Sequence, residues 1–588
     1  MEAPGERLPA VTVRQPAVSS LLRSNLVVAT GTALSRITGL LRVFVFAYVI
    51  GQTALGDAYK LGNETPNIVY DLLLGGVLSA TLVPLFTSFL PRGEGEGVTP
   101  EDTRATNVVI TTAATLMIAL TALAVVAAPL IFRLYSISVS DDVDADLFRS
   151  AGTTLTRIFL VQILFYGLTG IGNAFLQSRR RFFVAAWSPI LPNLIIIATL
   201  LSLPGAGDTE WGLQDVLDDQ RLRWTLGLGA TLGIASMAMV TLPAMFAAGL
   251  RYRPALEWKH PAVRRLLVLS GWMIGFVAAN QVAVVVIRNL ATHEGEGILS
   301  AYVDAFTWFV LPHGLLAVSI ATTFQPELAR AVLHRDRPEF VRRLSQGSRL
   351  ITLLTLPAAA GLFVLREPIV GLMQRGQFDP VASENTARAL AGLAIGLAAF
   401  SVYLFTLRGF YAHHDTRTPF MLNVGENLLN IVFAFLLVGR WGVLGLGLAY
   451  SFAYLLAAAW ALQVMSYKVP EFSVRSVLRD LWRPVLAVLL MAEATWLVTH
   501  DAPSDQGWDA VVQIVVGGFV GLVVYAAVLL VLRAPELSGL ARRLPGGRRY
   551  APAPTTIAPE ISEPDQVTQI ADETEIAEKE IAERPSPT

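Results

Sequence analysis

Long apolar runs separated by short polar segments dominate the chain. About fourteen of these runs reach the length of roughly twenty residues that an α-helix needs to cross a bilayer. The ten-residue alternation typical of a membrane β-barrel is not the pattern here. We therefore predict an all-α polytopic membrane protein with about 14 transmembrane helices. They begin near Asn25, Pro66, Asn107, Thr153, Phe183, Thr225, Arg264, Ile298, Arg349, Glu384, Pro419, Gly442, Leu478 and Asp509.

The connections between these runs alternate in charge, which predicts their orientation. Acidic connections cover residues 141–146, 207–219, 293–297 and 500–509. The connections between them are basic, at residues 179–181, 251–259, 330–343 and 468–479, as is the segment after the last run. Because basic loops stay in the cytoplasm, both termini are predicted to be cytoplasmic. An even number of spans gives the same orientation.

A weak internal repeat predicts the domain organisation. GGVLSATLVP (residues 75–84) lies near the end of the second span, and HGLLAVSIATTFQP (residues 313–326) near the end of the eighth. Parallel repeats of this kind are a known transporter plan, with the substrate site between the halves. We predict a cytoplasmic segment at residues 1–24, two six-helix halves at 25–250 and 251–467, and helices 13 and 14 at 468–532. A cytoplasmic tail follows at 533–588, basic at first and then acidic and disordered.

Composition narrows the chemistry. Hydrophobic residues make up 53% of the chain and charged residues 15%, whereas soluble proteins are about 25% charged. The chain has no cysteine, which excludes disulfides and thiolate chemistry, and its net charge of −1 favours no nucleic-acid partner. The nucleotide-binding motif G-x-x-x-x-G-K-[ST] is missing, and the seven histidines show no metal-ligand spacing. We therefore predict neither an enzyme nor a cofactor or metal site.

Two arginines stand out in the first span, residues 25–51. An arginine at the centre of a membrane helix costs about 2.5–3.5 kcal/mol on insertion scales, so Arg36 and Arg42 need a reason to be there. At about 100° per residue, Ser35 and Gly39 lie between the two arginines on one face of the helix. This small, polar face predicts contact with a wet or protein-lined interior, where a guanidinium suits an anionic substrate.

A purely structural role for the two arginines stays open. An ion pair inside the bundle would satisfy them, with Asp57, Glu64 or Asp71 as the available partner, and Arg42 also lies close enough to an interface to snorkel. Further charged residues inside predicted spans nevertheless favour a polar cavity, because several together make a bundle that faces only lipid improbable. They are Arg157, Asp304, Arg408 and Glu426.

Five segments together resemble the MurJ/MviN family of lipid II flippases. They read SRITGLLR, GDAYKLGNETPNIVYDLLLGGVLSATLVP, RRFFVAAWSPILPN, LPAAAGLFVLREPIVGLMQRGQFDP and RGFYAHHDTRTP. The resemblance covers roughly residues 25–467 in order. It implies a MATE-like fold of two six-helix repeats with two added C-terminal helices. It also implies that lipid II, the undecaprenyl-pyrophosphate-linked disaccharide-peptide of cell-wall synthesis, is carried across the bacterial cytoplasmic membrane by alternating access.

The resemblance also implies which residues bind the headgroup. The family's two span-one arginines correspond to Arg36 and Arg42, and its acidic residue at the start of span two to Asp57. We expect Asp57 to pair with a cation of span one or two in one state of the cycle. Two arginines of many relatives are replaced here by Tyr70 and Thr307. The positive charge of these two arginines could instead come from Lys60, Arg157, Arg288 or Arg408. The alternative is that other contacts hold the headgroup.

Three alternative functions remain from the sequence. The first is export of another polyprenyl-linked glycan, which would share the fold and the lipid carrier. The second is a drug/cation antiporter of the same superfamily, although such proteins usually have twelve spans. The third is a scaffold for cell-wall or division proteins that transports nothing. For the leading hypothesis we expect a monomer whose partners are lipid II and membrane lipids.

Overall fold

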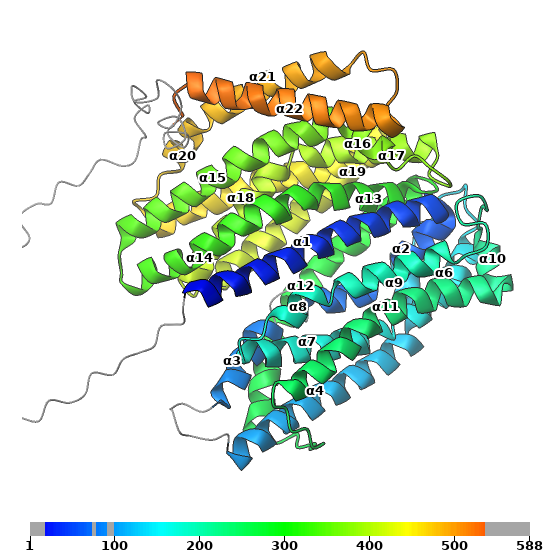
Figure 1. Cartoon of the computed structure of the whole chain (residues 1–588), viewed down its shortest axis with the longest axis vertical. Coiled ribbons are helices and arrows are strands. Elements are labelled where there is room, and N and C mark those ends of the chain that lie inside the picture. The colour runs from blue at the N-terminus through cyan, green and yellow to red at the C-terminus, as the bar shows by residue number, and fades with distance from the viewer. Residues whose placement is uncertain (1–17, 73–77, 91–98, 535–588) are drawn as a thin grey trace, which may run out of the picture.

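Helices are the regular elements of the chain wherever the structure describes it. The computed structural model describes residues 18–72, 78–90 and 99–534, without the side chains of 18–26, 69–72, 78–81, 262 and 265–279. Within these ranges the helices form two lobes and a C-terminal hairpin (Figure 1). The tail from residue 535 onward, and the prediction that it is disordered, lie outside the described residues.

The N-terminal lobe contains the helices up to α11. They are α1 (Val18–Val49), α2 (Ala54–Leu72), α3 (Leu78–Ser88), α4 (Pro100–Val126), α5 (Ala128–Tyr135), α6 (Ala145–Phe159), α7 (Gln162–Ser178), α8 (Phe183–Trp187), α9 (Ile190–Leu201), α10 (Leu213–Asp218) and α11 (Gln220–Ala247).

The C-terminal lobe and the hairpin follow. They comprise α12 (Pro261–Glu294), α13 (Ile298–Pro312), the π-helical turn η2 (His313–Ala317), α14 (Val318–Leu333), α15 (Arg337–Val364), α16 (Arg366–Gly371), α17 (Pro380–Ala394), α18 (Leu397–Ala412), α19 (Arg417–Lys468), α20 (Val474–Asp480), α21 (Trp482–Thr499) and α22 (Gly507–Val531).

Local sequence explains several helix ends. A capping box between Thr99 and Asp102 starts α4, and the Asp379 side chain accepts the Ala382 N–H at the start of α17. Each such cap is worth about 1 kcal/mol because it satisfies an N–H that has no partner inside the helix. Gly442 has φ 54°, and this left-handed residue breaks α19 into two helices joined at a kink.

The two lobes repeat the same packing scheme. In the N-terminal lobe α1 packs on α9, α2 on α6 and α3 on α7. In the C-terminal lobe α12 packs on α19, α13 on α17 and α14 on α18, in the same order along the chain. Two six-helix repeats, predicted from the short sequence repeat and the family resemblance, agree with this packing.

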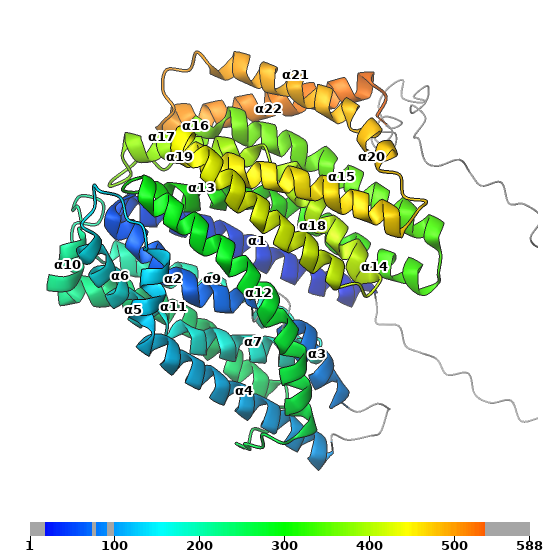
Figure 2. The ribbon, with the colours of Figure 1, turned by 180° about the vertical axis from the view of Figure 1, so that it is seen from behind.

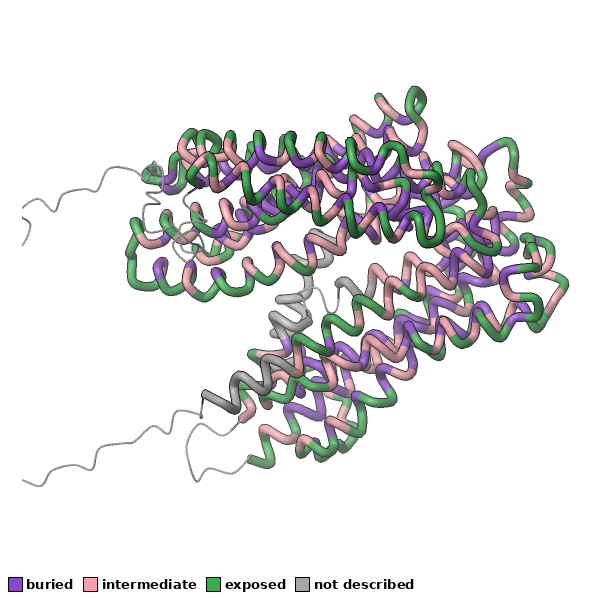
Figure 3. The backbone as a smooth tube through the Cα atoms, turned by 45° about the horizontal axis from the view of Figure 1, so that its top comes forward, coloured by how far each residue is buried: buried purple, intermediate pink, exposed green. Residues whose placement is uncertain are grey.

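The lobes meet at one end and diverge toward the other (Figure 3). The end where they meet carries the α1–α2 connection and α10, whereas the α14–α15 connection and the start of α1 lie at the other end (Figure 1). Helix α1 runs between the lobes. Helix α12 crosses from one lobe to the other, contacting α3 and α4 as well as α19 (Figure 2).

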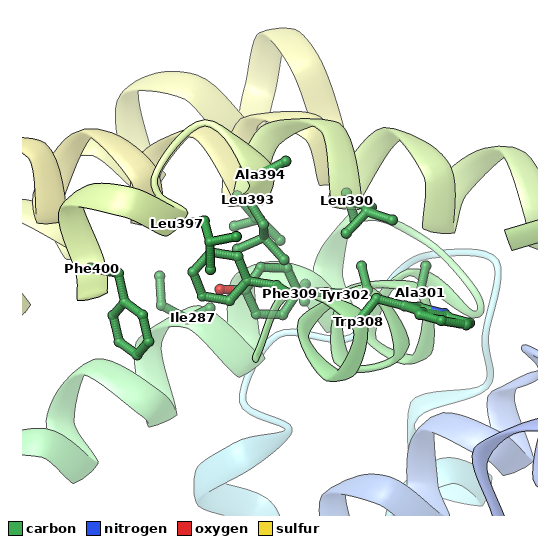
Figure 4. Close-up of a cluster of buried hydrophobic side chains, with 14 of the residues drawn as sticks. Ile287, Ala301, Tyr302, Trp308, Phe309, Leu390, Leu393, Ala394, Leu397 and Phe400 are labelled. Atoms are coloured by element: carbon green, nitrogen blue, oxygen red, sulfur yellow. The ribbon is translucent and has the colours of Figure 1, made fainter. Parts of the chain in front are cut away.

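A cluster of large aromatic and aliphatic side chains holds the C-terminal lobe together. Figure 4 shows Phe309 of α13 among Leu393 of α17 and Leu397 and Phe400 of α18. Phe309 is fully buried, and its ring centroid lies 5.3 Å from that of Phe400. Such buried aromatic pairs add about 0.5–1.5 kcal/mol beyond the area that they bury. This packing joins α13 to α17 and α18.

The predicted number of fourteen spans is not confirmed. Ten helices in the described ranges are long and apolar enough to cross a membrane, or eleven if the bent pair α17–α18 counts as one span. One of the ten is α19, which contains two predicted spans joined at Gly442. The other two predicted spans fall on α2–α3, between which residues 73–77 are not described, and on α12, where many side chains are not described.

The two last predicted spans form a hairpin on the outside of the C-terminal lobe. Helices α21 and α22 pack on each other and on α15, with Leu353, Met491 and Leu529 buried between them. The Tyr525 hydroxyl donates a hydrogen bond to the Leu353 carbonyl at 2.8 Å. The opposite face of the hairpin exposes large apolar side chains, including Leu489 and Phe519.

Close packing of α17 on α19 leads to a stability prediction. A Cβ atom at Gly447 would lie 2.6 Å from the Ala389 carbonyl oxygen, and backbone cannot move aside as a side chain can. We expect Gly447→Ala to cost about 1–3 kcal/mol by overpacking and to lower the apparent unfolding temperature of the purified protein. Gly439→Ala on the same helix is the control, because nothing lies within 4 Å of its Cβ position. Equal unfolding temperatures for both variants would contradict the close contact.

Candidate functional site

Two ion pairs join the lobes at the end where they meet. Lys60 of α2 contacts Asp304 of α13, with 2.7 Å between Nζ and Oδ1. Glu64, one turn further along α2, contacts Arg288 of α12 at 3.2 Å. All four side chains are at least three-quarters buried. Removing one partner of a buried ion pair costs about 3–5 kcal/mol, so these contacts hold the two lobes together here.

Asp57 joins the lobes in a different way. Its carboxylate accepts hydrogen bonds from the backbone N–H groups of Gly297 (2.9 Å) and Ser300 (2.8 Å), at the start of α13. The first N–H groups of a helix lack partners inside it and carry partial positive charge, so a buried carboxylate is well placed there. Asp57 therefore caps a helix of the opposite lobe in this conformation, and Lys60 acts on it only electrostatically.

The connection between α1 and α2 completes this junction. Gln52 donates from Nε2 to Thr386 Oγ1 at 2.6 Å and to Asp304 Oδ2 at 3.2 Å. The backbone N–H of Ala54 donates to Glu296 Oε1 at 2.7 Å. All three bonds cross between the lobes. We call the contacts of Asp57, Lys60, Glu64, Gln52 and Ala54 with the C-terminal lobe the interlobe junction.

Arg36 lies away from the interlobe junction, near the middle of α1. Its side chain is exposed, and its guanidinium lies beside Gly314 of η2, where a Cβ would be 3.8 Å from Arg36 Cζ. In the described ranges Arg36 forms no ion pair. The carboxylates of Asp57 and Glu64 are engaged in the interlobe junction, so the structure does not support an ion pair with either. Asp71 lies outside the described side chains.

A second guanidinium approaches the same place from α18. Arg36 and Arg408 both lie close enough to His313 of η2 to interact with it electrostatically. His313 is buried, with 2.9 Å between Nδ1 and Ser401 Oγ, and Arg408 Nη1 donates to Gln325 Oε1 at 3.0 Å. Side chains of α1, η2 and α18 thus form one basic cluster, which we call the Arg36–His313–Arg408 cluster. His313 was not predicted from the sequence, where its only signal is its place in the Pro312–Gly314 turn.

The small face of α1 has a structural contact. Asn193 of α9 donates from Nδ2 to the Ser35 carbonyl at 3.3 Å and to Thr38 Oγ1 at 3.1 Å. A Cβ at Gly39 would lie 3.6 Å from the same nitrogen. The structure therefore places Ser35 and Gly39 at the packing contact between α1 and α9, while Arg36 points toward the other lobe.

The remaining predicted charges are scattered. Arg42 is half-buried near Tyr59 of α2, and Arg157 of α6 is exposed and without an ion pair in the described ranges. Glu426 of α19 is buried at 2% exposure beside Tyr454. The structure does not bring these three residues to the Arg36–His313–Arg408 cluster.

The structure shows which of the four candidate cations lies near Arg36 and could replace the family arginines that are absent here. Thr307, at the position of an expected arginine, donates its hydroxyl hydrogen to the Val303 carbonyl within its own helix. Lys60 and Arg288 are neutralised by Asp304 and Glu64 in this conformation. Of the four candidate cations, only Arg408 comes close to the place that Arg36 occupies.

Two repeated lobes, joined at one end and with a basic cluster between them away from that end, define a membrane transporter of MATE-like architecture. The profile of the lipid II flippase MurJ family matches residues 46–517. The chain therefore belongs to the MurJ family of lipid II flippases.

Individual relatives agree with this assignment. The lipid II flippase MurJ of Burkholderia cenocepacia is 28% identical over 442 residues, covering 73% of this chain and 81% of the relative. The probable lipid II flippase MurJ of Vibrio cholerae is 26% identical over 445 residues, covering 75% and 82%. The corresponding protein of Thermotoga maritima is 24% identical over 528 residues, covering 89% and 99%.

Solved structures show the same fold. A lipid II flippase MurJ in an inward closed conformation matches with a TM-score of 0.70 at 22% identity, covering 88% of this chain and 100% of that one. An inward-facing multidrug resistance transporter of the MATE family matches with a TM-score of 0.56 at 15% identity, covering 74% and 95%. The all-α transporter fold predicted from the sequence is confirmed.

The interlobe junction can be tested with one reporter cysteine, because the chain has none of its own. Ala58→Cys on α2 replaces a fully buried residue and should react slowly with a thiol reagent. Adding Lys60→Asp places two carboxylates together, and we expect labelling to become faster by about tenfold or more. Adding Asp304→Lys as well should restore slow labelling.

A matched control uses an exposed ion pair. Arg104 and Glu257 lie 2.8 Å apart with Arg104 66% exposed, and such pairs contribute about 0–1 kcal/mol. Arg104→Asp should leave the labelling rate unchanged. If Lys60→Asp also leaves it unchanged, the ion pair does not hold the lobes together.

Proposed function

We propose that this protein moves lipid II across the bacterial cytoplasmic membrane by alternating access. Membership of the MurJ family supports the substrate. The observation that carries the proposal is the Arg36–His313–Arg408 cluster, which lies between two lobes whose interlobe junction is at one end. A membrane-embedded cation needs an anionic partner, and no carboxylate of the described residues pairs with Arg36.

The pyrophosphate of lipid II fits this cluster chemically. A guanidinium presents parallel N–H donors that match two phosphate oxygens, and the resulting charge-assisted hydrogen bonds are about twice as strong as neutral ones. In our proposal Arg36 and Arg408 bind the pyrophosphate from opposite lobes. Arg42 attracts it from further along α1, and Ser35 and Gly39 keep α1 in position through α9.

Alternating access would require the interlobe junction to open once in each cycle. The two buried ion pairs and the Asp57 cap then lose their partners together. A ligand that contacts both lobes stabilises the arrangement in which the lobes are close together around it. This binding free energy can offset part of the free energy lost when the interlobe junction opens. The proposal therefore gives Asp57, Lys60, Asp304, Glu64 and Arg288 a role in controlling access, while Arg36 and Arg408 bind the substrate.

The orientation follows from the charged connections. The α14–α15 connection and the start of α1 lie at the diverging end, together with the predicted cytoplasmic loops (Figure 1). We propose that this end faces the cytoplasm and that both termini lie there. Lipid II would enter from the leaflet in which it is made. The polyprenyl tail would run over the exposed apolar faces of α21 and α22, which a transporter of twelve spans lacks.

Replacement of Arg36 tests the binding role. Arg36→Ala should abolish complementation of a depletion strain and weaken lipid II binding by the purified protein. Loss of a charge-assisted contact of about 1.5–3 kcal/mol corresponds to roughly 10- to 100-fold. Arg36→Lys keeps the charge but loses the fork geometry, so it should impair both properties to a smaller extent. Arg42 variants should follow the same order with smaller effects.

The control for this test is Arg388→Ala on α17. Arg388 is 48% exposed and contacts Glu384 only at 4.0 Å, so its loss should change neither readout. All variants must reach the membrane at normal abundance. Full complementation and unchanged lipid II binding by Arg36→Ala would remove the arginine from the substrate site.

Single cysteines test the orientation. His334→Cys, in the exposed α14–α15 connection, should resist an impermeant thiol reagent in intact cells and react after lysis. Gln506→Cys, at the exposed start of α22, should react in intact cells. The reverse pattern would invert the proposed orientation without affecting the fold.

A further inference from the structure

A second basic site lies outside the space between the lobes. A cavity of about 520 Å³ opens between α1, α7, α8 and α11, at the end where the basic connections gather. Its wall is apolar and includes Val28, Leu176, Val184 and Ala244. Arg180 and Arg181 of the α7–α8 connection lie at the same cavity. None of its described lining residues is acidic.

The two arginines are positioned by the protein but not neutralised by it. Arg181 Nη1 donates to the Ala247 carbonyl at 3.0 Å, which fixes the guanidinium beside the end of α11. Arg180 has φ 57°, a left-handed conformation that is uncommon for an arginine, and its side chain is exposed. Neither forms an ion pair within the described ranges. Arg179, by contrast, lies over the Phe175 ring at 3.6 Å.

Like charges are therefore held close together here. Burial, followed by the charge of Arg181, lowers the pKa of Arg179. Unit charges a few ångströms apart repel by about 1 to 4 kcal/mol at the effective dielectric constants of water and of a protein surface. An anion from outside the protein would relieve this repulsion.

The repeat provides an internal comparison. Helix α18, which corresponds to α7, ends in the same turn: His414 has φ 58°, and Asp415 N donates to the Phe410 carbonyl at 3.0 Å. At the end of α7, Arg181 N donates to the Leu176 carbonyl at 2.9 Å. The position of Arg181 is thus occupied by Asp415, which pairs with Lys468 at 2.5 Å. Within the described ranges, the C-terminal lobe pairs the charge at this turn with a charge of its own, and the N-terminal lobe does not.

Exposed aromatic side chains place this site at the membrane interface. Phe182 and Phe183 are 41% and 57% exposed, and Phe183 stacks on Trp187 with 5.4 Å between ring centroids. Trp187 in turn donates from Nε1 to the Val27 carbonyl of α1 at 3.1 Å. Aromatic residues beside arginines are typical of the depth at which lipid headgroups meet acyl chains. The ligand that matches an apolar wall and a cationic rim is a lipid with a phosphate headgroup.

We propose that this cavity binds the phosphate headgroup of a membrane lipid, with Arg180 and Arg181 contacting the phosphate and an acyl chain on Val28 and Leu176. The bound lipid would connect α1 to the α7–α8 connection. Val27 and Arg36 lie about half a turn apart around α1, so this site and the interlobe cluster face different directions. The inference does not depend on the proposed transport of lipid II.

Native mass spectrometry of the full chain in neutral detergent tests the site. Phosphatidylglycerol and phosphatidylcholine are titrated separately, and the fraction of protein retaining lipid is measured. We expect phosphatidylglycerol to be retained preferentially. Arg180→Gln and Arg181→Gln should each weaken its retention about fivefold, the effect of roughly one basic residue near an anionic headgroup. Two variants are needed because Arg181→Gln also loses the hydrogen bond to the Ala247 carbonyl, which could change the local structure, whereas Arg180→Gln loses no such bond within the described ranges.

Arg335→Gln is the matched control. Arg335 has φ 57° at the end of α14, the same backbone conformation as Arg180, but it does not line the cavity. It should retain phosphatidylglycerol like the unchanged protein. Equal retention of the two phospholipids, or equal losses in Arg180→Gln and Arg335→Gln, would overturn the proposal.

A third titration separates the two sources of phosphate. Undecaprenyl pyrophosphate presents the same chemistry as the headgroup end of lipid II. If binding of undecaprenyl pyrophosphate needs Arg180 and binding of phosphatidylglycerol does not, the site for a bulk phospholipid is overturned and the cavity is assigned to the transported lipid. The opposite result would assign it to a bulk anionic phospholipid. Failure with both lipids would overturn the site while leaving the Arg36 prediction untouched.

Discussion

The contacts between α2 and the C-terminal lobe are the constraint on which the rest of the arrangement depends. Asp57, Lys60 and Glu64 lie on successive turns of one helix, and each finds its partner in the other lobe. Charged groups removed from water are stable only with such partners, so the lobes are held together here and free to diverge elsewhere. The same constraint leaves Arg36 without a carboxylate partner among the described residues. The engagement of Asp57 and Glu64 in the interlobe junction thus both holds the lobes together at one end and leaves Arg36 without these carboxylates as partners.

This arrangement divides the charges of the membrane region into two groups. The cations of the interlobe junction are satisfied by protein carboxylates and respond to movement of the lobes. Arg36 and Arg408 lie around His313, where guanidiniums from both lobes can contact one ligand. A negatively charged substrate stabilises one arrangement of the lobes over another only if it binds that arrangement more tightly. In our proposal the pyrophosphate of lipid II provides the negative charge that balances these two guanidiniums.

The internal repeat makes differences between the lobes informative. The same left-handed turn ends α7 and α18, but Asp415 pairs with Lys468 in one lobe and Arg181 lacks an acidic partner in the other, within the ranges that the structure describes. Equivalent backbone with different charge suggests different surroundings, namely protein in one case and lipid headgroups in the other. If both proposals hold, α1 contacts lipid on two opposite faces, one between the lobes and one at the membrane interface.

The sequence by itself determined that the chain is a helical membrane protein, because apolar runs of bilayer length admit few other structures. Its motifs identified the family, and the cost of burying a charge singled out Arg36. It did not reveal which charges are neutralised, because Lys60 and Asp304 are distant in the chain and meet only when the lobes pack. For the same reason Lys60 and Arg288 looked like free cations, the small face of α1 looked like a cavity wall, and His313 passed unnoticed. Only the tertiary structure decided these points, since the partner that sets the energy of a buried charge comes from another helix.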